Sequence, residues 1–386
     1  MTAATPTATG TAPPEGMLGE SRPIPLREVE AELANRLKAA QGPMTSPVQR
    51  AHMSNLVIAC DSAEQAGAIE GQIPEIVATH PARVLLLVGL PGEPAADVTA
   101  TVHVRSLRAA GGPRVFADQV TLRARGRGVD HLPYAVRELL IGDLPTNVWW
   151  ASHVPPPMAG PLLFDLTEQA QQVIYDSLGW LDPNRGVAAT SGWLTQFAHR
   201  PGAGRWRVAS DLNWRRLKTW RRLLGQALGP ATAPGALGSI TEVAMEHGPH
   251  AVTQAWQLMS WLAARLGWTV QAGRVQDGKE LTWQATAPHG MLRLRIRRLD
   301  DGPPEIRRVR VACLLCGQPG MLDVADDDGR LCVRLEGCDA SPRTVTAPPQ
   351  RPAELVARQL SDRERDPSFE EAMAVAQILA RSALNH

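Results

Sequence analysis

Several features that mark specialised protein classes are scarce in this chain. Its 386 residues include five cysteines, four phenylalanines and two tyrosines, and 40 basic residues nearly balance 39 acidic ones, which leaves a net charge of +1. A nearly neutral chain has no overall attraction for nucleic acid or for acidic membranes. Few cysteines, no long apolar run and no signal-peptide pattern favour a cytoplasmic protein with reduced thiols. We therefore expect neither a membrane nor a nucleic-acid partner.

Motifs for catalysis and for cofactor binding are also missing. The turns Cys60–Ser62 and Gly89–Gly92, which follow the first two long apolar runs, contain neither GxGxxG nor a phosphate loop. The ten histidines form no HExxH or HxH pattern, and Ser177 and Ser191 lack the strand–turn–helix context of a nucleophile. The sequence therefore predicts a binding or regulatory protein that is not an enzyme and has no cofactor.

The patterns that are present predict a protein of α/β plus α+β class. Short apolar runs alternate with helical periodicity from Met53 to Trp150, which is typical of a mixed sheet with helices packed on it. Farther along, alternating strands such as Met291–Leu299 predict an antiparallel sheet, with leucines inward and arginines outward. A Trp-rich helix at His250–Leu266 is expected to cover its apolar face.

The expected domains follow from these patterns. They are a disordered tail and docking helix at 1–47, an N-terminal α/β domain at 48–160, a C-terminal α+β domain at 161–341, and a linker with a helical tail at 342–386. Within the third, we expect a helical segment at 161–228, a linker at 229–238 and the sheet at 239–341.

Two groups of side chains are candidates for partner binding. Trp149 and Trp150 end an apolar run, and successive strand residues point to opposite faces, so both indoles are core or one of them faces a partner. The segment 205–222 holds seven basic residues and one acidic residue. Three interpretations are open: a solvated face, a docking surface for an acidic protein, or a site for phosphate or nucleic acid. We favour docking through Arg215, Arg216, Trp220 and Arg222.

Four cysteines cluster near the C-terminus, at Cys313, Cys316, Cys332 and Cys338. A CxxC pair followed by a second pair is the beginning of a zinc-site pattern, but the second spacing here is C-x5-C. Buried core residues, a redox pair and a structural zinc site are the three interpretations. Burial in the core is the simplest interpretation for cysteines within strand patterns. We therefore predict no metal site, and we retain all four cysteines as candidate redox thiols.

Ordered motifs along more than half of the chain resemble one family. Asn55-Leu56-Val57 and His80–Val84 come first. Next come a strand with Asp143–Pro145 and Trp149-Trp150, then prolines, and then an expected helix that ends in Val173–Ser177. Asp211–Trp214, followed by Arg216-Leu217 and Thr219–Arg221, comes last. In this order and spacing they are similar to OpcA, the glucose-6-phosphate dehydrogenase assembly protein family.

This resemblance implies a non-catalytic function. Members of the family assist assembly and activation of glucose-6-phosphate dehydrogenase in the oxidative pentose phosphate pathway, which implies that this enzyme is the partner and that the protein is an allosteric activator of it. The alternative is an enzyme that binds a phosphosugar between its two domains.

Overall fold

The protein is described here from a computed structural model. The structure describes residues 17–18, 22–41, 49–50, 52–108, 114–200, 207–276, 278–337 and 339–384. The chain divides into two compact units, Met1–Pro145 and Thr146–His386, whereas the sequence patterns place a domain boundary at residue 160. Within the described part, none of the helices combines the length and apolar character needed to cross a bilayer.

The first unit contains a mixed sheet in the order β1-β5-β6-β4-β3, with β2 beside β6. β3, β4 and β6 run parallel, and β5 pairs antiparallel with β6. Nearly all of β3 and β4 is buried, as expected for continuous apolar runs in a covered sheet. The strands are β1 (Met17–Leu18), β2 (Gln49–Arg50), β3 (Ser54–Cys60), β4 (Ala82–Leu90), β5 (Val98–Arg108) and β6 (Arg114–Arg125).

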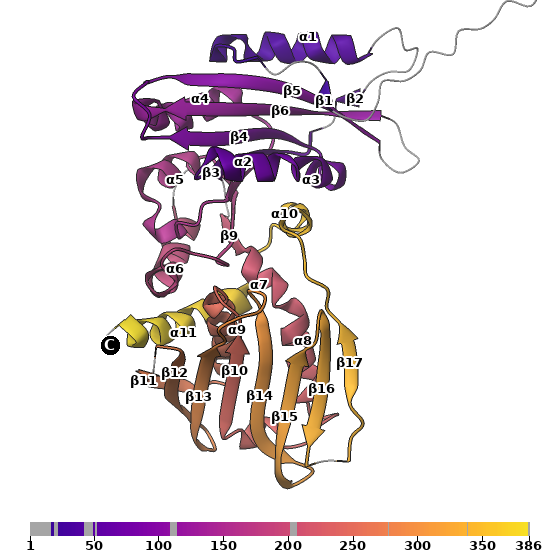
Figure 1. The fold of residues 1–386 in the computed structure, drawn as a ribbon, viewed down its shortest axis with the longest axis vertical. Coiled ribbons are helices and arrows are strands. Elements are labelled where there is room, and N and C mark those ends of the chain that lie inside the picture. The colour runs from indigo at the N-terminus through magenta and orange to yellow at the C-terminus, as the bar shows by residue number, and fades with distance from the viewer. Residues whose placement is uncertain are drawn as a thin grey trace, which may run out of the picture. The chain divides into compact units, whose positions relative to one another are not determined.

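Helices pack on this sheet (Figure 1). The predicted docking helix is α1, whose Val29 and Leu33 are buried and which contacts β5 and β6 of its own unit. Ser62 caps the next helix by accepting from the backbone N–H of Gln65. The helical segments are η1 (Leu26–Glu28), α1 (Val29–Gln41), α2 (Ala63–Glu70), α3 (Ile73–Thr79), η2 (Gly126–His131) and α4 (Leu132–Leu139).

The second unit begins with three parallel strands, β7 (Thr146–Trp150), β8 (Gln172–Tyr175) and β9 (Val208–Asp211). Every residue of β7 and β8 is buried. The helical segments around and after them are η3 (Pro156–Met158), α5 (Gly160–Leu166), α6 (Pro183–Ala198), α7 (Leu212–Arg216) and α8 (Lys218–Ala227).

An eight-stranded sheet forms the rest of the second unit, in the order β11-β12-β13-β10-β14-β15-β16-β17. α9 contacts β10 and β13, and Figure 1 shows α8 and α9 behind the strands. The elements are η4 (Leu237–Ser239), β10 (Glu242–His247), α9 (Val252–Arg265), β11 (Thr269–Gln276), β12 (Glu280–Ala287), β13 (Gly290–Arg298), β14 (Ile306–Leu315), β15 (Gln318–Asp326), β16 (Arg330–Glu336), β17 (Arg343–Thr346), α10 (Pro352–Ser361) and α11 (Pro367–Leu384).

The predicted mixed α/β fold is confirmed, with two corrections. The segment 161–228 is not helical throughout, because it contains β8 and β9. The C-terminal sheet is not entirely antiparallel, because β10 lies between β13 and β14 and pairs parallel with β13. Sequence alternation indicates which side of a strand is buried, but it contains no information on the order of neighbouring strands.

The helices predicted for the C-terminal tail are α10 and α11. Their apolar faces, including Leu355, Phe369 and Leu379, are buried. α11 contacts α6, α9 and β11, so this segment is part of the core of the second unit.

Candidate functional site

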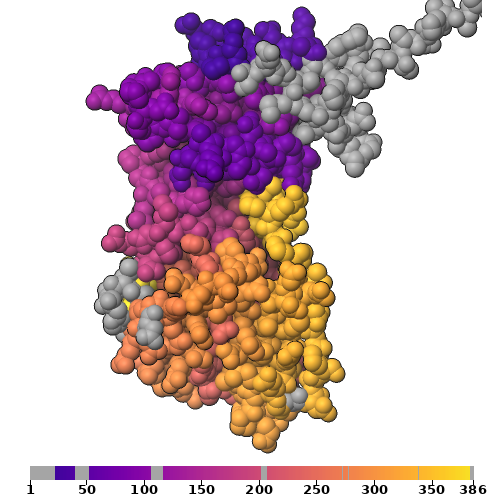
Figure 2. Space-filling model, in the orientation of Figure 1, coloured from indigo at the N-terminus to yellow at the C-terminus, as the bar shows by residue number. Residues whose placement is uncertain are grey.

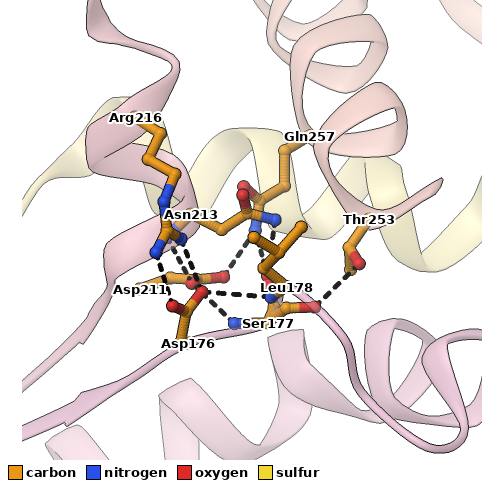
Figure 3. A network of polar contacts seen from close by, with 8 residues as sticks. All are labelled: Asp176, Ser177, Leu178, Asp211, Asn213, Arg216, Thr253 and Gln257. Carbon is orange, nitrogen blue, oxygen red and sulfur yellow. Dashed lines mark hydrogen bonds and ion pairs between the residues drawn. The ribbon is translucent and has the colours of Figure 1, made fainter. Parts of the chain in front are cut away.

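The most extensive buried polar network in the second unit surrounds the carboxylate of Asp211, at the end of β9 (Figure 3). β8 and β9 are parallel neighbours with Tyr175 opposite Asp211, so the chain leaves both strands at the same edge. Asp211 Oδ1 accepts from the backbone N–H of Ser177, at 3.0 Å, and from that of Asn213, at 2.9 Å. Oδ2 accepts from Gln257 Nε2, at 2.6 Å. One carboxylate therefore caps α7 and links it to β8 and α9.

A second carboxylate, that of Asp176, lies beside the first and pairs with an arginine. Arg216 donates from both Nη atoms to the two oxygens of Asp176, at 2.6 and 2.7 Å. The side chains of Arg216 and Asp176 are only 13% and 24% exposed. Paired, partly buried charges in a bidentate arrangement fix the relative position of α7 and the end of β8.

Ser177 connects the strand ends to α9. Its backbone carbonyl accepts from Thr253 Oγ1 at 2.8 Å, and its Oγ accepts from Asn213 Nδ2 at 3.1 Å. Gln257 Nε2 also lies 3.3 Å from this Oγ. Ser177 is fully buried, and the donors around its hydroxyl are amide groups, so its surroundings fit a structural link better than an activated nucleophile.

The electrostatics of this network centre on Asp211. Burial, reinforced by the nearby charge of Asp176, raises the pKa of Asp211 to about 6. Burial and then Asp211 also raise the pKa of Tyr175 well above its usual value. Burial disfavours the charged form of Arg216, yet the ion pair with Asp176 leaves its pKa above the ordinary arginine value. Asp211 is thus a carboxyl group that changes charge near neutral pH.

A cavity of about 320 Å³ borders Asp211 on the side of α7 and of the connection between α10 and α11. Trp214 donates from its indole to Asp366 Oδ2 at 2.7 Å, and the guanidinium of Arg221 lies 3.6 Å from the centre of the Trp214 ring. Arg215 donates to Asp362 at 2.6 Å. Burial lowers the pKa of Arg221 to about 10. The lining contains charges of both signs, so it has no clear preference for an anion or a cation.

The tryptophans predicted for partner binding are all buried. Trp149 is 4% exposed, Trp150 is 5% exposed and Trp220 is 8% exposed. Trp150 also donates from its indole to the carbonyl of Val154 at 2.8 Å. Of the two interpretations left open by the sequence, the structure favours the one in which both adjacent indoles are core.

The arginines predicted for partner binding have three different surroundings. Arg216 is committed to Asp176, and Arg215 donates to Gln359 and Asp362 across to the α10 region. Arg222 is exposed on α8. The basic segment is therefore not one solvated face, because much of its charge pairs within the unit. Docking through these arginines stays a prediction.

The cysteines do not assemble a site in the part of the chain that the structure describes. Cys60 and Cys313 are buried and free, and Cys332 is free and half-buried. Burial raises the pKa of Cys313, which disfavours a reactive thiolate. Cys316 is disulfide-bonded, and Cys338 lies outside the described residues. No three His, Cys, Asp or Glu side chains among the described residues come together in a way that could hold a metal ion.

The sequence patterns did not reveal that these polar residues form one network, although two of the family motifs contain several of them. The two motifs Val173–Ser177 and Asp211–Trp214 each continue an apolar run into polar residues. In the structure these runs are β8 and β9, and their parallel pairing brings the polar ends of the two motifs together. Thr253 and Gln257 come from helix α9, far along the chain from both motifs, so nothing local indicated their contribution.

The fold and network define a protein with two mixed α/β units, in which buried polar groups join sheet ends to helices. Profiles for a "Glucose-6-phosphate dehydrogenase subunit N-terminal domain" and for its "C-terminal domain" match residues 74–191 and 207–373. The chain therefore belongs to the OpcA family, which confirms the resemblance seen in its motifs.

Cyanobacterial relatives and solved structures extend the comparison. The OxPP cycle protein OpcA of Synechococcus elongatus is 25% identical over 338 residues, which cover 80% of this chain and 70% of the relative. The OpcA of Synechocystis is 25% identical over 281 residues, which cover 68% of this chain and 55% of the relative. Each relative therefore has sequence outside the match.

Among solved structures, an oxidoreductase from Sinorhizobium meliloti aligns with 14% identity and a TM-score of 0.48, over 88% of this chain and 98% of its own. The transcriptional regulator Gal80p from Kluyveromyces lactis aligns with 8% identity and a TM-score of 0.48, over 88% of this chain and 94% of its own. Similarity this distant carries no argument about activity.

Proposed function

We propose that this protein binds glucose-6-phosphate dehydrogenase and promotes formation of the active oligomer of that enzyme, as a non-catalytic allosteric activator in the bacterial cytoplasm. Through this partner it serves the oxidative pentose phosphate pathway. The observation that carries the proposal is the pair of family matches, which lie one after the other along residues 74–191 and 207–373.

The geometry of the second unit supports a binding role. The buried polar groups of Asp211, Ser177 and Asn213 bond to one another and to helix α9, and they stabilise the scaffold. The names of the cyanobacterial relatives place those proteins in the OxPP cycle, which is consistent with the same partner here.

The test is to mix the purified protein with the dehydrogenase of the same organism. We expect the two to sediment as one complex and the initial rate of glucose-6-phosphate oxidation to rise, while this protein alone oxidises none. Lysozyme added at the same concentration controls for non-specific stabilisation by added protein. Separate sedimentation together with unchanged kinetics would contradict the proposal.

A further inference from the structure

The eight-stranded sheet of the second unit has one apolar face and one charged face. In β13, Leu292, Leu294 and Ile296 are buried, whereas the alternate positions Arg293 and Arg297 are exposed. α9 contacts the sheet at β10 and β13, and Figure 1 shows α8 and α9 on its far side. In Figure 2 the strands from β12 to β16, in orange, form the molecular surface on the near side, with no helix over them.

The strand register brings arginines from several strands together on the charged face. Arg293 lies opposite Glu242, Arg310 opposite Asp323, and Asp323 in turn opposite Arg334. We call this surface the arginine face. Its arginines in the described chain are Arg274, Arg293, Arg295, Arg297, Arg308, Arg310, Arg330 and Arg334, and its carboxylates are Glu242, Glu246, Glu280, Asp323 and Glu336.

Ion pairs within the face use some of these arginines and leave others available. Arg295 pairs with Glu242 at 3.0 Å, Arg308 with Asp323 at 2.7 Å and Arg310 with Glu246 at 3.3 Å. The face therefore has a fixed frame of paired charges in its centre.

Exposed arginines flank this frame, and three of them lie on different strands. The guanidinium groups of Arg274, Arg293 and Arg334 make no ion pair or hydrogen bond within the described part of the chain. Exposed, unpaired guanidinium groups are fully able to bind the carboxylates of another molecule in a bidentate manner.

A hollow of about 390 Å³ opens on the same face over β11, β12 and β13. Arg274, Arg293 and Arg295 line it, together with Glu280. Arg295 pairs with Glu242 and also lies 3.9 Å from Glu280, so the excess positive charge in the hollow comes from Arg274 and Arg293. An acidic side chain that enters it would find bidentate donors already held in position by the strands.

We propose that the arginine face is the surface that docks an acidic region of glucose-6-phosphate dehydrogenase. This inference rests on the proposed function and deepens it by identifying the surface. The interspersed carboxylates fit a protein surface that contains both signs of charge, whereas they would repel the uniform phosphate backbone of a nucleic acid. A second copy of the chain is disfavoured because it would bring two faces with the same excess charge together.

The test compares two triple variants in the full chain with equal changes in charge. In the face variant, Arg274→Glu, Arg293→Glu and Arg334→Glu reverse three of the unpaired arginines. In the matched control, Arg265→Glu, Arg358→Glu and Arg381→Glu reverse exposed, unpaired arginines on helices of the same unit. Binding to the purified dehydrogenase is titrated at low and high salt, and circular dichroism checks that both variants remain folded.

We expect the face variant to bind about tenfold or more weakly and to lose most of the salt dependence of binding, because complementary charges act on encounter. The control should bind within about twofold of the wild type. Unchanged binding by the face variant would overturn the inference and leave the proposed function intact. Competition by duplex DNA would overturn it in favour of nucleic acid. If the wild type itself does not bind the dehydrogenase, the proposed function falls, and this inference falls with it.

Discussion

At the scale of single residues, Asp211 combines burial with three hydrogen bonds to its carboxylate. Hydrogen bonds from Ser177 and Asn213 favour its charged form, but burial and the charge of Asp176 outweigh them and raise the pKa to about 6. Arg216 bonds from both Nη atoms to Asp176, and its charge does not bring the pKa of Asp211 back to the ordinary value. Asp211 therefore keeps a proton more readily in the folded protein than in the unfolded chain.

The Asp211→Asn variant tests this difference. Because the folded pKa is raised above the ordinary 3.8, protonation of Asp211 stabilises the wild type at low pH, and that contribution is lost as the pH rises through about 6. We expect the free energy of unfolding of the wild type, measured relative to the variant in urea, to be about 1.4 kcal/mol higher near pH 5 than near pH 7.5.

The variant should fold, because the amide of Gln257 can turn. Gln257 Oε1 has no hydrogen-bond partner in the described structure, so after rotation it can accept from the new Asn amide. A difference between wild type and variant that stays constant with pH would show that Asp211 titrates at its ordinary value.

At the scale of elements, the sequence predicted most strands and helices, and its errors have physical causes. β3, β4 and α9 have the length and periodicity that distinguish a buried strand from a helix. β8 has only four residues, Gln172–Tyr175, and all four are buried. Such a short buried strand has no alternation, so its apolar residues also fit a helical spacing with α5.

The candidate partner residues were harder to predict, because charge in sequence does not show where its partner lies. Arg215 finds Asp362, and Arg216 finds Asp176, both far away along the chain. A local count of basic residues therefore overestimated the free charge of this segment. On β13, alternation alone showed which arginines point outward, because the apolar positions between them must be buried.

Within the basic segment, we predict unequal effects of two arginine substitutions on stability. Arg216→Ala should lower the free energy of unfolding by about 3 kcal/mol, because it leaves Asp176 partly buried, unpaired and next to Asp211. Arg222→Ala should change it by less than about 0.5 kcal/mol, because the side chain is exposed. Urea unfolding of the wild type and of both variants measures these changes in the free energy of unfolding. Equal effects would show that the Arg216–Asp176 pair adds no stability.

At the scale of the whole molecule, the proposed function leaves two modes of action on the dehydrogenase to distinguish. In one, this protein would shift the dehydrogenase toward its active oligomer, and in the other it would raise the rate of an oligomer that is already complete. The first is what the proposed function states. The two differ in how the effect depends on the concentration of the dehydrogenase, because self-association depends on concentration and the rate of a complete oligomer does not.

We therefore predict that activation is strongest in dilute dehydrogenase. At low enzyme concentration the subunits dissociate, and a protein that binds the active oligomer preferentially shifts the equilibrium toward it. At high concentration the oligomer is already formed, so added protein should raise the specific activity little. The measurement is specific activity over about a hundredfold range of dehydrogenase concentration, with this protein at saturation. The face variant at the same concentrations provides the control and should activate less, because it binds the dehydrogenase more weakly. A constant degree of activation across the range would mean that the protein acts on catalysis within a complete oligomer.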